Sequence, residues 1–365
     1  MSDGRQRLGL PPPQTGLQVA IVGRIGGTHI GDSLRHAATQ SGHQVAFFDV
    51  EGAEVGFAPL RSLAWRFDHR PIGLRRFSDR VAEACVRHPP DLMITTGAGG
   101  LTGEAVQAIR GAGTIIANYS TDDPWNPSLR ARWHLKALPH YDVIFTPRRA
   151  NIDDFRRHGC RDVHYLPFGY DERYAHPPET EPGADDASDV LFVGGADRDR
   201  AAFMSGFARP GVAVKLAGGY WERFAQFRQG ALGLKSPEAL RRLTAAAKLN
   251  LCLVRRANRD GHVMRSLEIG AIGGCMLAED TAEHRELLGP DGEAVVYFAS
   301  PADAAGKAAA LLPAQDERRR MAARLQARIA SGRHTYGDRL AAMLAAALPA
   351  DKLTAARPIA ESAKA

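Results

Sequence analysis

The stretch Gln18–Gly31 (QVAIVGRIGGTHIG) joins an apolar run to a glycine-rich turn. Its first five residues, QVAIV, are almost wholly apolar, as is typical of a strand buried on both faces of a sheet. The glycines lead into a helical pattern that ends near Gly42. A strand, a glycine-rich turn and a helix in this order indicate the start of a parallel α/β sheet covered on both faces.

The same alternation continues after this stretch, then stops and restarts. Further apolar strand candidates in the first half are Val45–Val50, Leu92–Thr96, Thr114–Ala117 and Val143–Thr146. The segment His176–Asp189 is rich in proline, glycine and acidic residues, which indicates a linker. The strand candidates after it are Val190–Val193, Val212–Leu216, Leu249–Val254, Cys275–Ala278 and Val295–Phe298.

The restart predicts two doubly wound, Rossmann-like α/β domains that face each other across a cleft. We expect the N-terminal, acceptor-side domain over residues 1–175, the linker over 176–189 and the C-terminal domain over 190–333. A helical stretch is expected over Pro301–Ala330. A last helix over residues 334–350 should return toward the N-terminal domain, and residues 1–14 and 351–365 should be flexible. Ligands of such sheets bind beyond the carboxyl ends of the strands, so the loops there are the candidate sites.

Length, charge and cysteine spacing exclude several classes of protein. The 365 residues are 44% hydrophobic, enough for two packed cores. The net charge of +6 is spread along the chain, which argues against a nucleic-acid-binding module. The four cysteines are too far apart in sequence for a disulfide framework or a zinc site. With no secretory signal and no apolar run of membrane-spanning length, a cytoplasmic location is expected.

Two carboxylates stand directly after the strand candidate Thr114–Ala117. The segment Asn118–Asn126 (NYSTDDPWN) contains Asp122, Asp123 and Trp125. Carboxylates beside an indole commonly hold and deprotonate a sugar hydroxyl, so Asp122 and Asp123 are candidate catalytic residues. The alternative is that an aspartate caps the next helix.

The glycine turn itself admits two interpretations. Gly26 and Gly27 lie in a segment that resembles a phosphate-cradling turn, but its spacing is neither GxGxxG nor that of a P-loop. The alternative is that the glycines only let a helix approach the strand. His29, at the expected helix start, is a candidate catalytic residue or else a surface histidine.

The second half contains the residues expected to bind a nucleoside diphosphate. Gly194 and Gly195 form a turn after a strand, where backbone amides and nearby arginines suit phosphates. Arg265 and Glu268 are three residues apart and therefore share one helix face, where the acid can accept from a ribose and the cation can face phosphates. An ordinary ion pair is the alternative. The other candidate donor-binding residues are Lys248, Asp260 and His262.

The segment Pro59–Arg80 concentrates arginines and aromatic residues. It suits contact with an anionic acceptor or with a membrane surface. The alternative is a pair of solvated helices over the sheet.

In its second half the sequence resembles the GT-B glycosyltransferases of the CgeB-like (spore-maturation, group 1) family. The resemblance rests on an ordered series of segments: His164–Pro177 (HYLPFGYDERYAHP), Asp189–Arg200 (DVLFVGGADRDR), Val212–Trp221 (VAVKLAGGYW), Ala245–Gly274 and Pro301–Leu340. It covers residues from about Asp142 to Leu344 and is thin before them. It implies that Glu268 holds the donor ribose and that Asp260 replaces the first glutamate of an E-x7-E pair.

Together these patterns predict a glycosyltransferase that moves a sugar from a nucleotide-diphosphate sugar to an unidentified acceptor, which is a glycan, a protein or a small molecule. No metal site is expected, because Arg265, Lys248 and the glycine amides can stabilise the leaving group. No cofactor is expected. The alternatives are a sugar-nucleotide epimerase, a catalytically silent sugar-nucleotide-binding protein and, least favoured, a nicotinamide-dependent enzyme.

Overall fold

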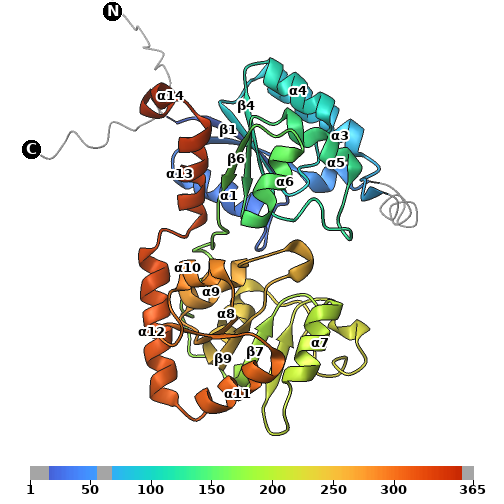
Figure 1. Cartoon of the computed structure of the whole chain (residues 1–365). Helices are drawn as coiled ribbons and strands as arrows, with labels where there is room; N and C mark the ends of the chain where they lie inside the picture. Colours follow the sequence, from blue (N-terminus) through green and yellow to red (C-terminus); the bar gives the residue numbers. More distant parts are fainter. Residues whose placement is uncertain (1–15, 56–67, 356–365) are drawn as a thin grey trace, which may run out of the picture.

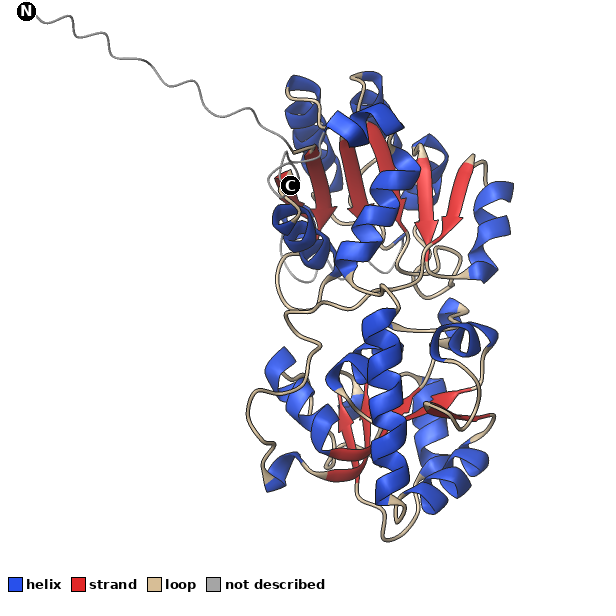
Figure 2. Cartoon of the chain, turned by 90° about the vertical axis from the view of Figure 1, so that its left-hand side faces the viewer, coloured by secondary structure: helices blue, strands red, loops and turns tan. Residues whose placement is uncertain are grey.

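The computed structural model describes residues 16–55 and 68–355, which form two α/β domains stacked along the long axis of the molecule (Figure 1). Each domain is built on one sheet whose strands are all parallel. The predicted fold class is confirmed. Figure 2 shows both sheets as central layers with helices on either side.

The N-terminal sheet has the strand order β2-β1-β3-β4-β5-β6. Its strands are β1 (Gln18–Gly23), β2 (Gln44–Asp49), β3 (Leu92–Thr96), β4 (Ile115–Tyr119), β5 (Val143–Thr146) and β6 (Asp162–Tyr165). Because side chains alternate along a strand, each face presents its own apolar set. One face is covered by α3 (Leu74–Arg87), α4 (Gly103–Gly111), α5 (Arg132–Ala137) and α6 (Ile152–Arg157). The other face is covered by α1 (Ile30–Gln40) and α13 (Tyr336–Ala347).

The C-terminal sheet has the strand order β11-β10-β9-β7-β8. Its strands are β7 (Ser188–Val193), β8 (Val214–Ala217), β9 (Ala247–Cys252), β10 (Met276–Glu279) and β11 (Val295–Phe298). Helices α7 (Arg198–Phe207) and α11 (Pro301–Leu311) cover one face. The other face carries α8 (Pro237–Ala246), α9 (Met264–Ile272) and α10 (Ala282–Leu288), and α12 (Gln315–Ser331) packs against α9.

The chain crosses between the domains twice, and the two crossings lie side by side. The backbone N–H of Tyr170 donates to the His334 carbonyl at 3.0 Å, and the N–H of Tyr336 donates to the Tyr170 carbonyl at 3.0 Å. After the second crossing, α13 packs against α1 on the N-terminal domain, as the red helix in Figure 1 shows. Its apolar residues Leu340 and Met343 are buried in the same core as β1 and β3.

Some elements differ from the sequence predictions. The helical stretch Pro301–Ala330 is broken between α11 and α12, where Pro313 follows the end of α11. The first residues of the expected flexible tail belong to a further helix, α14 (Ala350–Ala355). Residues 59–67 of the basic segment Pro59–Arg80, residues 1–14 and residues 356–365 lie outside the described part of the chain. No helix in the described part is long and apolar enough to cross a membrane.

Candidate functional site

A cavity of about 660 Å³ lies between the two domains. It is lined by the loops that follow β1, β3, β4 and β5 in one domain and β7 and β9 in the other. In the N-terminal sheet β1 pairs with β2 on one side and β3 on the other, and in the C-terminal sheet β7 pairs with β8 and β9 in the same way. These are the points where strand order reverses, and ligands of doubly wound sheets bind there.

Glu268 and Arg265 meet at the start of α9, and both line the cavity. The Arg265 guanidinium Nη1 lies 3.0 Å from the Glu268 carboxylate Oε2, with the two side chains 18% and 8% exposed. No other described side chain forms a hydrogen bond with this carboxylate. The i, i+3 ion pair of the alternative interpretation is therefore present, but it stands in the cavity wall, where a ligand can reach both groups.

Two further arginines add positive charge to the same side of the cavity. Arg200 is buried, and it donates to the carbonyls of Gly195 and Leu253 at 3.0 and 3.3 Å. Burial lowers the pKa of Arg200, and the neighbouring charge of Arg255 lowers this pKa further. Within the described chain Arg255 has no ion pair or side-chain hydrogen bond, although it lines the cavity. Nε of Arg200 lies 4.0 Å from the Asp197 carboxylate, whereas Arg255 has no acidic partner among the described residues. An unpaired cation beside a second arginine suits an anionic group such as a diphosphate.

Asp260 also lines the cavity, but its carboxylate is held by a residue of the other domain. Its Oδ1 accepts from Nε of Arg148, and both side chains are almost completely buried. Burial raises the pKa of Asp260, and the opposing charge of Arg148 only partly offsets this. Arg148 was not among the predicted residues, although it stands two positions after β5, at the sheet edge where sites form.

The two adjacent aspartates have different environments. Asp123 is 1% exposed. Its carboxylate accepts from the Trp125 backbone N–H at 2.9 Å, from Asn151 at 2.9 Å and from Arg259 Nε at 2.6 Å. Asp122 is exposed to the cavity and accepts one hydrogen bond, from Asn258 Nδ2 at 3.1 Å.

Both aspartates line the cavity, but they are not equivalent: Asp122 has one hydrogen-bond partner, whereas the Asp123 carboxylate is engaged in a turn and in the contact between the domains. The predicted role of Trp125 is wrong. Its ring packs edge-on against Phe155, 4.8 Å between centroids, and it does not line the cavity.

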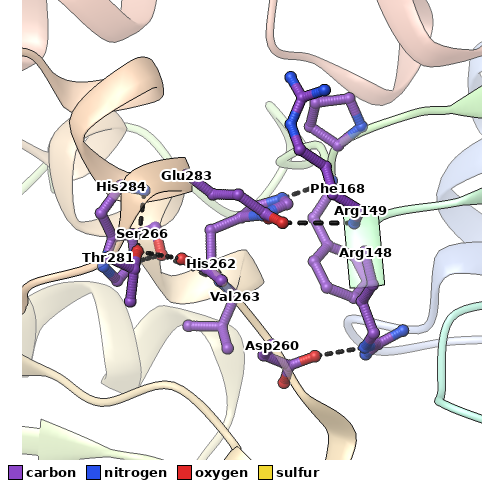
Figure 3. A network of polar contacts seen from close by, with 12 residues as sticks. Arg148, Arg149, Phe168, Asp260, His262, Val263, Ser266, Thr281, Glu283 and His284 are labelled. Atoms are coloured by element: carbon purple, nitrogen blue, oxygen red, sulfur yellow. Dashed lines mark hydrogen bonds and ion pairs between the residues drawn. The ribbon is translucent and has the colours of Figure 1, made fainter. Parts of the chain in front are cut away.

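His262 belongs to a buried network between the domains, shown in Figure 3, rather than to the cavity wall. Its Nε2 accepts from the Phe168 N–H at 3.0 Å, so its Nδ1 carries the proton and donates to Glu283 at 2.7 Å. Burial opposes ionisation of Glu283, but the hydrogen bond from His262 holds the pKa of this carboxyl below its usual range. The expectation that His262 binds the donor is corrected, because both ring nitrogens are already engaged.

The remaining predicted residues divide between the cavity and its surroundings. His29 and Gly194 line the cavity. Gly195 does not, and neither do Gly26 and Gly27, which form the tip of the turn with φ of 80° and 54°. The close contact in this turn is between Gly31 and Gly23, where a Cβ on Gly31 would lie 2.9 Å from the Gly23 Cα. The helix-approach interpretation of the glycines therefore holds for this pair.

Lys248 was predicted to bind the donor, but it does not line the cavity. It is the second residue of β9, at the end of the strand opposite the cavity. Its Nζ pairs with Asp189 at 2.8 Å. The strand had been identified, but the side chain lies at its amino end, and only the carboxyl ends of parallel strands reach the site.

Within residues 16–55 and 68–355, no group of three or more histidine, cysteine, aspartate or glutamate side chains is arranged to hold a metal ion.

Comparison with known proteins identifies the architecture. Residues 200–345 match the model of a family described as glycosyl transferase-like. No curated protein matches the sequence. The structure is similar to sucrose-phosphate synthase from Thermosynechococcus elongatus, with a TM-score of 0.68 at 12% identity over 93% of this chain and 99% of that one.

Two further solved structures share the same arrangement. HepE from Anabaena in complex with UDP-glucose has a TM-score of 0.61 at 14% identity, over 90% of this chain and 99% of that one. The N-terminal domain of trehalose-6-phosphate phosphatase from Candida albicans has a TM-score of 0.60 at 15% identity, over 97% and 99%. The fold is thus the GT-B fold of glycosyltransferases.

Proposed function

We propose that this GT-B-fold chain is a glycosyltransferase that uses a nucleoside-diphosphate sugar as donor. The observation that carries the proposal is the pair Glu268 and Arg265 at the start of α9, in the wall of the interdomain cavity. The glycosyl transferase-like family match over residues 200–345 includes both residues and supports the proposal. The UDP-glucose bound by HepE supports the same donor class.

The C-terminal side of the cavity has the groups that such a donor requires. The Glu268 carboxylate accepts from the ribose hydroxyls, and Arg265 moves from Glu268 toward the diphosphate. Arg255 and Arg200 add charge beside the Gly194 turn. As the glycosidic bond breaks, negative charge grows on the leaving diphosphate, and cations fixed in place stabilise that charge. This is why we propose that transfer does not require a metal ion.

The N-terminal side of the cavity receives the acceptor. Asp122 is the proposed base for its hydroxyl, because it is exposed to the cavity and has only one hydrogen-bond donor. The closer resemblance to CgeB-like enzymes, transfer of a hexosyl group and a cytoplasmic location are parts of this proposal.

A thermal-shift screen with UDP, GDP, ADP, dTDP and their glucose conjugates tests the donor class. A ligand present at 100 times its Kd stabilises the fold by about 2.7 kcal/mol, which is readily measured as a rise in Tm. At least one nucleotide should raise Tm, and it should do so equally with EDTA or Mg²⁺ present. No shift with any nucleotide would contradict the proposal, and a shift that requires Mg²⁺ would contradict metal independence.

A further inference from the structure

The N-terminal wall of the cavity differs in chemistry from the arginine-rich donor side. One part of this wall is apolar, and we call the group that its side chains form the apolar subsite: Val50, Ala53, Pro71, Leu129, Ala131 and Trp133. They come from the segment after β2, from the segment that leads to α3, from the segment before α5 and from the first turn of α5 itself. A surface of this composition favours an apolar ligand face.

The positive charges that line this side are paired with acidic residues of the protein. Among the described residues of the N-terminal domain, the arginines that line the cavity are Arg24 and Arg148, and no lysine lines it. Arg24 pairs with Glu51 at 3.0 Å and also with Glu54. Arg148 pairs with Asp260. Among the described residues that line the cavity on this side, no cation is therefore left unpaired for a phosphate or carboxylate of the acceptor, in contrast to the donor side, where Arg255 has none of these partners.

His134, on α5, is an unpaired polar group in the same wall. Its side chain lines the cavity and is only 4% exposed. Its Nδ1 is completely buried and has no hydrogen-bond partner in the described chain. No described residue bonds to Nε2 either, and this nitrogen is the one that remains open to the cavity. Burial lowers the pKa of His134 to about 4, so the ring is neutral at pH 7.

Exposed apolar side chains stand beside this wall. Ile25, Val55 and Ile72 are large, exposed hydrophobic residues. Each is adjacent in sequence to a residue that lines the cavity, namely Arg24, Glu54 and Pro71. Exposed apolar side chains whose neighbours in the chain line a cavity are consistent with a binding region there.

We propose that the apolar subsite binds an uncharged, hydroxyl-bearing acceptor with an aromatic or aliphatic ring body, and that His134 hydrogen-bonds to its polar group. The inference rests on the proposed function and names its acceptor class. His134 is a specificity-determining residue in this arrangement. An acceptor that pairs with its open nitrogen gains a hydrogen bond without having to displace an existing one.

The test compares two small probes on the full chain saturated with UDP, using saturation-transfer difference NMR titrations. The probes are 2-naphthol, which is flat and uncharged, and glucose 6-phosphate, which is polar and anionic. We expect 2-naphthol to bind about tenfold or more tightly than glucose 6-phosphate. His134→Leu should weaken 2-naphthol binding about 3- to 10-fold, the effect of one hydrogen bond. Trp133→Ala should weaken it as well, by removing apolar contact area.

His88→Leu is the matched control, because His88 is exposed at the end of α3 and does not line the cavity. It should leave both affinities unchanged. Preference for glucose 6-phosphate, binding of neither probe, or 2-naphthol binding that is unchanged in both His134→Leu and Trp133→Ala would overturn the proposed acceptor class. A failure of the donor proposal can be told apart from a failure of the acceptor proposal. In that case the protein would not bind any nucleotide, but 2-naphthol would still bind to it in the absence of UDP.

Discussion

At the scale of single residues, the Glu268 carboxylate is the group whose loss should be most informative. We expect Glu268→Ala to weaken nucleoside-diphosphate binding about 10- to 150-fold, since a charge-assisted hydrogen bond in a partly dry site contributes about 1.5–3 kcal/mol. Glu268→Gln keeps the shape and should cost less. Isothermal titration calorimetry measures both.

Arg265 should behave differently in the same titrations. Arg265→Ala should weaken binding of the diphosphate but have little effect on the nucleoside monophosphate, whereas the loss in Glu268→Ala should persist with both. Glu238→Ala is the control, because Glu238 is exposed on α8 and lies outside the cavity. If both cavity variants bound nucleotide like the unchanged protein, the donor would not lie on α9.

Substitutions of Asp123 and Asp122 should have different effects, the first on the stability of the fold and the second on activity. Asp123→Ala removes the acceptor of three hydrogen bonds, one of them from a charged arginine, and should destabilise the fold by about 2–3 kcal/mol in urea unfolding. Asp122→Asn should leave Tm nearly unchanged and reduce acceptor-dependent nucleotide release about 100-fold or more, as expected for loss of a general base. A stable but fully active Asp122→Asn would remove this residue from catalysis.

The sequence could predict the site only where local spacing determined it. Arg265 and Glu268 were found because helical periodicity alone places them on one face. Arg148 and His134 were missed because only tertiary packing brings them to the cavity. Lys248 and His262 were misplaced for related reasons. Lys248 lies at the amino end of its strand, where it pairs with Asp189. Both ring nitrogens of His262 form hydrogen bonds, with Phe168 and Glu283.

At the scale of elements, α9 is held against α12 through a glycine. A Cβ on Gly270 would lie 2.6 Å from Ile329 Cγ1 and 3.0 Å from Leu325 Cγ. We expect Gly270→Val to force the helices apart, to lower stability by about 1–3 kcal/mol and to weaken nucleotide binding, because the donor residues move with α9. Thermal unfolding and calorimetric titration measure the two effects.

Gly306→Val is the matched control for this substitution. Gly306 also lies inside a helix, α11, but a Cβ there would meet nothing within 4 Å. It should keep both the stability and the nucleotide affinity. Equal behaviour of the two variants would show that the α9–α12 contact does not position the site.

The order of elements followed from the sequence better than their ends did. Short, continuous apolar runs such as QVAIV predicted buried parallel strands, because they are too short for most helices, contain β-branched residues and are followed by glycine. The break between α11 and α12 was not predicted, even though Pro313 stands at it. Helical periodicity continues on both sides of this proline, and periodicity alone does not reveal a change of helix axis.

At the scale of the whole molecule, Arg259 joins the domains by two ion pairs. Its Nε lies 2.6 Å from Asp123 and its Nη1 lies 2.7 Å from Asp154, both in the N-terminal domain. Arg259→Glu places three negative charges together and should favour an open arrangement of the domains. Small-angle X-ray scattering should show a larger radius of gyration, with the circular dichroism unchanged.

The control for this experiment is Arg256→Glu, three residues earlier. Arg256 pairs with Glu279 at 2.8 Å within its own domain. This variant should keep the radius of gyration of the unchanged protein. An Arg259→Glu variant as compact as that control would mean that these ion pairs do not hold the domains together.

Acid should destabilise the molecule before the carboxylates titrate. Burial lowers the pKa of His134, His284 and His334 to about 4. An unfolded histidine has a pKa near 6.5, so between about pH 6.5 and pH 4 the unfolded chain binds more protons than the folded one. Tm should therefore fall steadily over this range and stay level above it. A Tm that is constant from pH 7.5 to pH 4.5 would contradict neutral burial of these rings.

The double crossing of the chain has a consequence for biosynthesis. One face of the N-terminal sheet is covered by α1 and α13, and α13 is translated only after the entire C-terminal domain. While the ribosome makes residues 166–335, the apolar side chains of β1, β3 and β4 on that face are packed against α1 but not yet against α13. The first domain to be synthesised is thus the last to complete its core, and the nascent chain exposes a hydrophobic surface of the kind that chaperones bind.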